Sequence, residues 1–113
     1  MLFPDNFNIW LHKEPTDMRK SINGLSLLVA NFYKHNLQSG DIFIFYNRNK
    51  DKIKAIYWHY NGFCLLQKNL DRNGFKIPKE LTDVISLSKN QLLRLFDGLH
   101  FFNKKADNPD IFY

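Results

Sequence analysis

The sequence contains few residues of the kinds that crosslink, kink or loosen a chain: one Cys, four Pro and five Gly among 113 residues. The single cysteine, Cys64, excludes an intrachain disulfide framework and a zinc site built from several cysteines, and it fits a reducing compartment. No apolar run approaches the roughly 18 residues that a membrane-spanning helix needs, and the first residues show no export signal. We therefore expect a cytoplasmic protein with no membrane partner.

The composition is that of a folded domain with an excess of positive charge. Hydrophobic residues make up 44% of the chain and aromatic residues 16%, enough to build one core without metal or disulfides. Residues 103–113 are polar and contain a proline, so we expect a single domain over residues 1–102 followed by a flexible tail. The net charge of +5 predicts attraction to phosphate-rich partners.

The hydrophobic pattern predicts strands and two helices. Polar and apolar residues alternate over residues 8–12, which indicates a short strand. Apolar residues then recur every three to four positions over residues 18–33, which predicts a helix with Thr16 or Asp17 as its N-cap. A second helix is expected to begin at Ser88, which forms a capping-box spacing with Gln91, and to end near Gly98.

Between the two helices the pattern is that of an antiparallel meander. Strands are predicted at residues 41–46, 53–60, 63–70 and 75–77. Asn61-Gly62 joins the middle pair, since this dipeptide suits a turn in which both residues have positive φ, and it sets Tyr60 opposite Phe63. The predicted fold is α+β: an antiparallel meander of about four to five strands with both helices packed on one face.

No catalytic or metal-binding motif emerges from the sequence. The four histidines at positions 12, 35, 59 and 100 lack the spacing of metal ligands, and His59 with Cys64 is better explained as a cross-strand pair. Nucleophile elbows and glycine-rich phosphate loops are missing too. We therefore expect a protein that is not an enzyme, with no cofactor, metal or small-molecule substrate.

Basic residues form the most informative group. Arg48, Lys50, Lys52 and Lys54 crowd one turn and the start of the next strand, with aromatic residues interleaved. Cations that neutralise phosphates beside aromatic rings are typical of nucleic-acid binding. The alternative is a turn that is charged because it is solvated, with the aromatic residues in the core.

Two further cations lie in the first turn of the predicted first helix. Arg19 and Lys20 occupy a position where the helix dipole disfavours positive charge. Together with the free N–H groups they could bind a phosphate or a carboxylate. The alternative is that Asp17 pairs with one of them and nothing else binds.

Many segments of the chain resemble one protein family in order and spacing. The matching segments are residues 10–11, 16–20, 23–25, 39–45, 54–58, 61–63, 74–75, 85–87 and 91–93. Thr-Asp-Met-Arg-Lys at residues 16–20, followed at this distance by Asn-Gly, is the most specific of these signals. The chain resembles the TnpB-type accessory protein encoded by the second open reading frame of the family-sixty-six bacterial insertion sequences. It departs from that family in a thinner arginine run near Arg48 and in Ile77-Pro78, where the family has Trp-Pro.

The resemblance implies a non-catalytic accessory protein of transposition that works beside a separate transposase. One hypothesis is that it binds DNA or a transposase–DNA complex through six cations: Arg19, Lys20, Arg48, Lys50, Lys52 and Lys54. Four to six phosphate contacts would give a slope of log affinity against log salt of about −4 to −5. The alternative is recruitment of the transposase, without DNA contact, through four aromatic residues: Trp58, Tyr60, Phe101 and Phe102. A third possibility, a small nuclease built from dispersed carboxylates, would require magnesium-dependent cleavage.

Overall fold

The computed structural model describes residues 7–32, 40–79, 81 and 83–102. Its elements are β1 (Ile9–Leu11), α1 (Ile22–Phe32), β2 (Ile42–Tyr46), β3 (Lys52–His59), β4 (Gly62–Asn69), β5 (Ile85–Leu87) and α2 (Lys89–Phe96). The predicted α+β class is confirmed. The predicted tail at residues 103–113 and the predicted last residue of the first helix lie outside the described residues. Neither described helix is long and apolar enough to cross a membrane.

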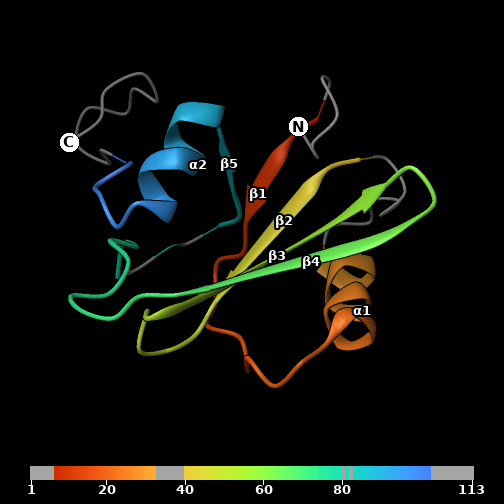
Figure 1. The fold of residues 1–113 in the computed structure, drawn as a ribbon, viewed down its shortest axis with the longest axis horizontal. Helices are drawn as coiled ribbons and strands as arrows, with labels where there is room; N and C mark the ends of the chain where they lie inside the picture. The colour runs from red at the N-terminus through yellow and green to blue at the C-terminus, as the bar shows by residue number, and fades with distance from the viewer. Residues whose placement is uncertain (1–6, 33–39, 80, 82, 103–113) are drawn as a thin grey trace.

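The five strands form one mixed sheet in the order β4-β3-β2-β1-β5 (Figure 1). Strands β2, β3 and β4 form the predicted antiparallel meander, but β1 runs parallel to β2 and antiparallel to β5. The prediction of a purely antiparallel sheet is therefore wrong. Parallel neighbours require a long crossover connection, and the segment that contains α1 supplies it between β1 and β2.

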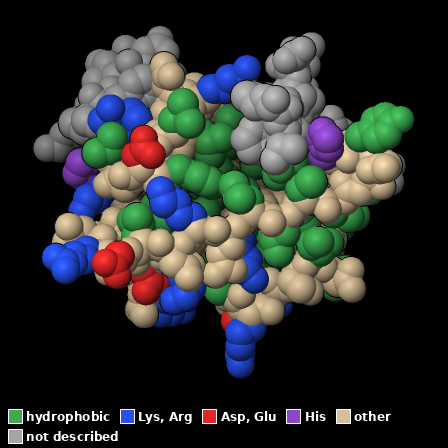
Figure 2. Space-filling model, viewed as in Figure 1, with side chains coloured by type: hydrophobic (Ala, Val, Ile, Leu, Met, Phe, Trp, Pro, Cys, Tyr) green, Lys and Arg blue, Asp and Glu red, His purple; other side chains and the backbone are tan. Residues whose placement is uncertain are grey.

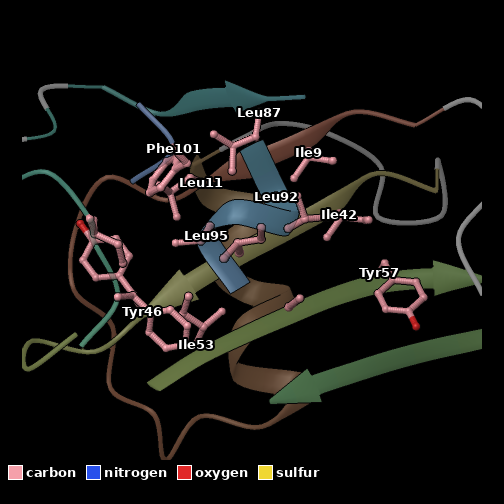
Figure 3. Close-up of a cluster of buried hydrophobic side chains, with 14 residues drawn as sticks. Ile9, Leu11, Ile42, Tyr46, Ile53, Tyr57, Leu87, Leu92, Leu95 and Phe101 are labelled. Atoms are coloured by element: carbon pink, nitrogen blue, oxygen red, sulfur yellow. The ribbon is translucent and has the colours of Figure 1, made fainter. Parts of the chain in front are cut away.

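The two helices cover opposite faces of the sheet, so the prediction that both lie on one face is wrong. Alternate side chains of β2 point into two different hydrophobic cores, one on each face of the sheet. Phe43 and Phe45 pack with α1, whereas Ile42, Ile44 and Tyr46 belong to the cluster that contains the buried leucines of α2 (Figure 3). A strand that is apolar on both sides requires a cover on each face, because either face left in water would expose its side chains.

The β3–β4 hairpin differs from its predicted register by two residues. The turn consists of Tyr60 and Asn61, and His59 pairs with Gly62. Tyr60 adopts φ 58°, in the left-handed region that favours glycine. A shift of two residues leaves each side chain on its predicted face, because side chains alternate with a period of two.

The predicted strand at residues 75–77 is absent from the sheet, although the segment is packed. Phe75 and Ile77 are buried in the same cluster as α2. The Phe75 N–H donates to the Lys50 carbonyl at 2.6 Å. The segment thus lies against the β2–β3 turn rather than beside another strand.

Candidate nucleic-acid interface

One end of the sheet gathers several separate segments of the chain around the β2–β3 turn, residues 47–51. Thr16 donates its N–H to the Tyr46 carbonyl at 2.7 Å, and Phe75 donates to the Lys50 carbonyl, so segments far apart in sequence meet here. We call the surface formed by residues 15–19, 47–52 and 73–79 the basic end. In Figure 2, Lys and Arg side chains are frequent over the left and lower part of the molecule, where these turns lie in Figure 1, with acidic side chains among them.

Asn47 fixes the shape of the turn. Its side-chain oxygen accepts hydrogen bonds from the N–H groups of Asp51 and Lys52 at 3.1 and 3.0 Å, and its amide donates to the Asp51 carboxylate. The Asn47 hydrogen bond is the main reason why the pKa of Asp51 is lowered. The turn therefore holds Arg48 and Asn49 exposed at its outer side.

A hollow of about 610 Å³ lies on one side of this turn, and it brings three of the six predicted cations together. Arg19, Arg48 and Lys52 line it, with Asp17 as the acidic member. The other lining residues are Pro15, Thr16, Met18, Asn47, Asn49 and Gln67. Within the described residues no ion pair engages Arg48, whereas Lys52 lies 3.6 Å from the Asp51 carboxylate.

Arg19 is paired with Asp17, one of the two alternatives that the sequence left open. The guanidinium lies 2.6 Å from the carboxylate, and the Arg19 N–H also donates to Asp17 at 2.9 Å. The Arg19 hydrogen bonds lower the pKa of Asp17 to about 2. Asp17 thus closes a turn rather than capping α1, which begins at Ile22. The prediction that Arg19 and Lys20 lie in the first helical turn is wrong, and Lys20 lines neither hollow of the basic end.

Lys54 is buried and cannot serve as a phosphate ligand in this structure. Its side chain is 7% exposed, and its ammonium donates to the Met18 and Lys20 carbonyls at 2.6 and 2.7 Å. Lys54 thereby holds the segment before α1 against β3. Lys54 shares its face of β3 with buried Ile56, because side chains alternate along a strand.

A second hollow, of about 500 Å³, lies on the other side of the β2–β3 turn. Lys50 lines it and donates to the Ile77 carbonyl at 3.0 Å. The other cations of this hollow, Lys76 and Lys79, come from the segment after β4 and are not among the six cations predicted to bind DNA. The remaining lining residues are Asn73, Phe75, Ile77, Pro78, His100 and Phe102.

The four predicted contact aromatics divide between the hairpin tip and the interior. Tyr60 is 88% exposed, and half-buried Trp58 packs edge-on against Phe63 with ring centroids 4.8 Å apart. Phe101 is fully buried beside α2, so its predicted role as a contact residue is wrong, and Phe102 is half-buried. We call Trp58, Tyr60 and Phe63 the hairpin tip.

The histidines and carboxylates that the structure describes do not converge. Among the described residues, no group of three His, Cys, Asp or Glu side chains is placed to hold a metal ion. His12 is buried against Phe45, and burial lowers its pKa.

Comparisons with known proteins connect these features to one family. A family model described as "IS66 Orf2 like protein" matches residues 7–106. The chain is 34% identical over 94 residues to the uncharacterized protein y4hO of Sinorhizobium fredii (strain NBRC 101917 / NGR234), an alignment that covers 83% of this chain and 82% of the relative. It is 30% identical over 97 residues to the uncharacterized protein y4jC of the same strain, covering 86% and 83%. No solved structure matches the chain significantly.

The family match includes every described strand and helix, together with the basic end and the hairpin tip. It also agrees with the resemblance that the segments of the sequence suggested. This chain therefore belongs to the IS66 Orf2-like family, the accessory proteins of a group of bacterial insertion sequences.

Proposed function

We propose that this protein supports transposition of its insertion sequence by binding the DNA backbone at the basic end, alone or together with the transposase. The observation that carries the proposal is the position of Arg48. It is exposed on a fixed turn, borders a hollow of about 610 Å³, and pairs with no acid in the described part of the chain. An arginine with free donors is well suited to phosphate oxygens.

Neighbouring groups extend this contact. Lys52 lines the same hollow, and Lys50, Lys76 and Lys79 line the hollow beyond the turn. A DNA backbone that crosses the β2–β3 turn would meet cations on both sides of the turn. Contacts of this kind position a protein on DNA without reading base sequence.

The acids of the basic end limit the strength of binding. Asp17 engages Arg19 and Asp51 lies beside Lys52, so both cations would have to exchange a carboxylate for a phosphate. Lys54 is removed from the predicted set because it is buried. Counting two to three effective contacts, we expect a salt slope on duplex DNA of about −2 to −3, shallower than the sequence alone predicted.

A salt titration against duplexes from the ends of the element tests this proposal. Arg48→Gln should reduce the magnitude of the slope by about 0.9, one released counterion. Lys89→Gln is the matched control, since it removes the same charge from an exposed position at the start of α2. The proposal fails if the wild-type slope is near zero or if the two variants lose affinity equally.

A second candidate function, recruitment of the transposase through the hairpin tip, is favoured by the exposure of Tyr60. A ring that is 88% exposed on a left-handed residue contributes nothing to the described core, and exposed aromatic residues are enriched among the anchors of protein interfaces. Co-purification of the transposase should be lost in Tyr60→Ser and kept in Arg48→Gln. Retention in both variants contradicts this candidate.

A further inference from the structure

In the described part of the chain, the long edge strand β4 has one hydrogen-bonding side without a partner. Strand β4 pairs with β3 alone and forms one end of the sheet (Figure 1). Leu70, which directly follows it, donates its N–H to the Asp51 carbonyl on the β3 side at 2.8 Å. Since backbone groups alternate in direction along a strand, the even-numbered residues of β4 face β3. Four residues therefore direct their N–H and C=O groups outward: Phe63, Leu65, Gln67 and Asn69.

Nothing in the described part of the chain occupies these outward groups. No backbone or side-chain hydrogen bond between described residues reaches them, and the pairing of β3 with β4 runs without a bulge from end to end. The strand contains no proline, and its single charged residue, Lys68, donates its ammonium to the Phe96 carbonyl. Proteins normally protect a long edge with charge, proline or a bulge. This edge has none of these on its outer side.

We propose that β4 pairs with β4 of a second copy of this chain, antiparallel, to form a continuous ten-stranded sheet. A second copy fits because each of the four outward residues offers one N–H and one C=O, and these residues recur at every second position on both sides of Leu66. A two-fold axis at Leu66 sets Leu65 opposite Gln67 of the second copy and Phe63 opposite Asn69, which uses all the outward groups. This is an isologous contact.

The side chains also suit this register. Leu66 is 44% exposed and would face its own counterpart across the axis, in a pair without backbone hydrogen bonds, where side chains approach most closely. Lys68 would lie opposite Cys64 of the second copy rather than opposite another lysine. No like charges oppose each other along the contact. The proposal rests only on the edge, and because Gln67 also lines the first hollow, self-association is measured in the absence of DNA.

The pairing predicts a weak, concentration-dependent dimer, since seven paired residues per copy bury less than a standard interface. In sedimentation equilibrium without DNA, the mass should rise from that of the 13.5 kDa chain at about 1 µM toward twice that value at about 1 mM. Amide exchange of the wild-type protein gives a second readout. Only the outward amides, such as those of Leu65 and Gln67, should slow with rising concentration, because β3 already protects the even-numbered ones.

Variants test whether the β4 edge forms the contact between the two copies. Gln67→Pro removes one outward donor without touching the β3 ladder, and should weaken self-association at least about tenfold, whereas Gln67→Ala should not. Leu66→Lys should also weaken it, and Leu27→Lys, an exposed leucine of α1, is its control. A chain that stays monomeric at about 1 mM, a dimer indifferent to Gln67→Pro, or a uniform change in amide exchange would each overturn the proposal.

Discussion

The two lysines of β3, Lys52 and Lys54, should respond to the same substitution in opposite ways. Both are basic and they are two positions apart, yet Lys54 is 7% exposed and donates to two carbonyls, whereas the Lys52 side chain is 40% exposed. Replacement by Met preserves the length of the side chain and removes its charge. In Lys54→Met the Met18 and Lys20 carbonyls lose their donor.

The expected loss of stability in Lys54→Met follows from these two hydrogen bonds. Each bond to a charged donor contributes about 1.5–3 kcal/mol, and part of this is offset because a buried ammonium no longer has to be desolvated. We expect a net loss of about 2–3 kcal/mol, which lowers Tm by about 8–12 °C in a domain of this size. Lys52→Met removes only a surface ion pair, so its cost should stay below about 1 kcal/mol.

DNA binding should show the reverse order. Lys52→Met should reduce the magnitude of the salt slope by about 0.9, and Lys54→Met should leave the slope unchanged at a temperature where circular dichroism shows it folded. Thermal unfolding and a salt titration on the same two proteins test both halves. An unchanged Tm in Lys54→Met, or a loss of slope as large as that of Lys52→Met, would refute the reasoning.

Two further predictions follow from the turns at the two helices. Asp17→Asn should free Arg19 and steepen the DNA salt slope by about 0.9. In the wild-type protein the pKa of Asp17 is lowered to about 2, so the contribution of this carboxylate to stability is present above the ordinary aspartate pKa and is lost as pH falls through about 2. A carboxyl NMR titration measures this pKa. A titration midpoint near the ordinary value would show that the Asp17–Arg19 pair does not form. Ser88→Ala removes the N-cap of α2, whose side chain accepts from Gln91 at 3.1 Å, and should cost about 1 kcal/mol, or about 4 °C in Tm. Ser86→Ala, an exposed serine of β5, should change Tm little by comparison.

Local patterns predicted the elements that depend on neighbours in sequence. The capping box of Ser88 and Gln91 is present in both directions, and the hairpin of β3 and β4 forms with its side chains on the predicted faces. Both features arise from contacts within a few residues or across one tight turn. The mixed sheet could not be predicted in this way, because the periodicity of β1 says nothing about which strands lie beside it.

Of the candidate site, the sequence predicted the cations in and beside the β2–β3 turn, because charged turn residues are normally exposed. Arg48 and Lys52 do line a hollow together, because the turn that carries them is fixed by its own side chains. Lys54 follows them in sequence but points to carbonyls of a segment more than thirty positions away. Its burial depends on the packing of β3 against the segment before α1. This contact is long-range, so local sequence patterns do not reveal it.

The position of β1 between β2 and β5 determines the sequence of steps in which the sheet forms. This first strand is flanked on both sides, with Ile9 paired to Ile42 on β2 and to Leu87 on β5. During synthesis the meander of β2, β3 and β4 can close from contacts near in sequence, whereas β1 must wait for almost the whole chain before its second flank is filled. Strand β1, which precedes the other described strands, is thus the last to become interior, and in pulse-labelled exchange its outer amides should gain protection only after those of β3.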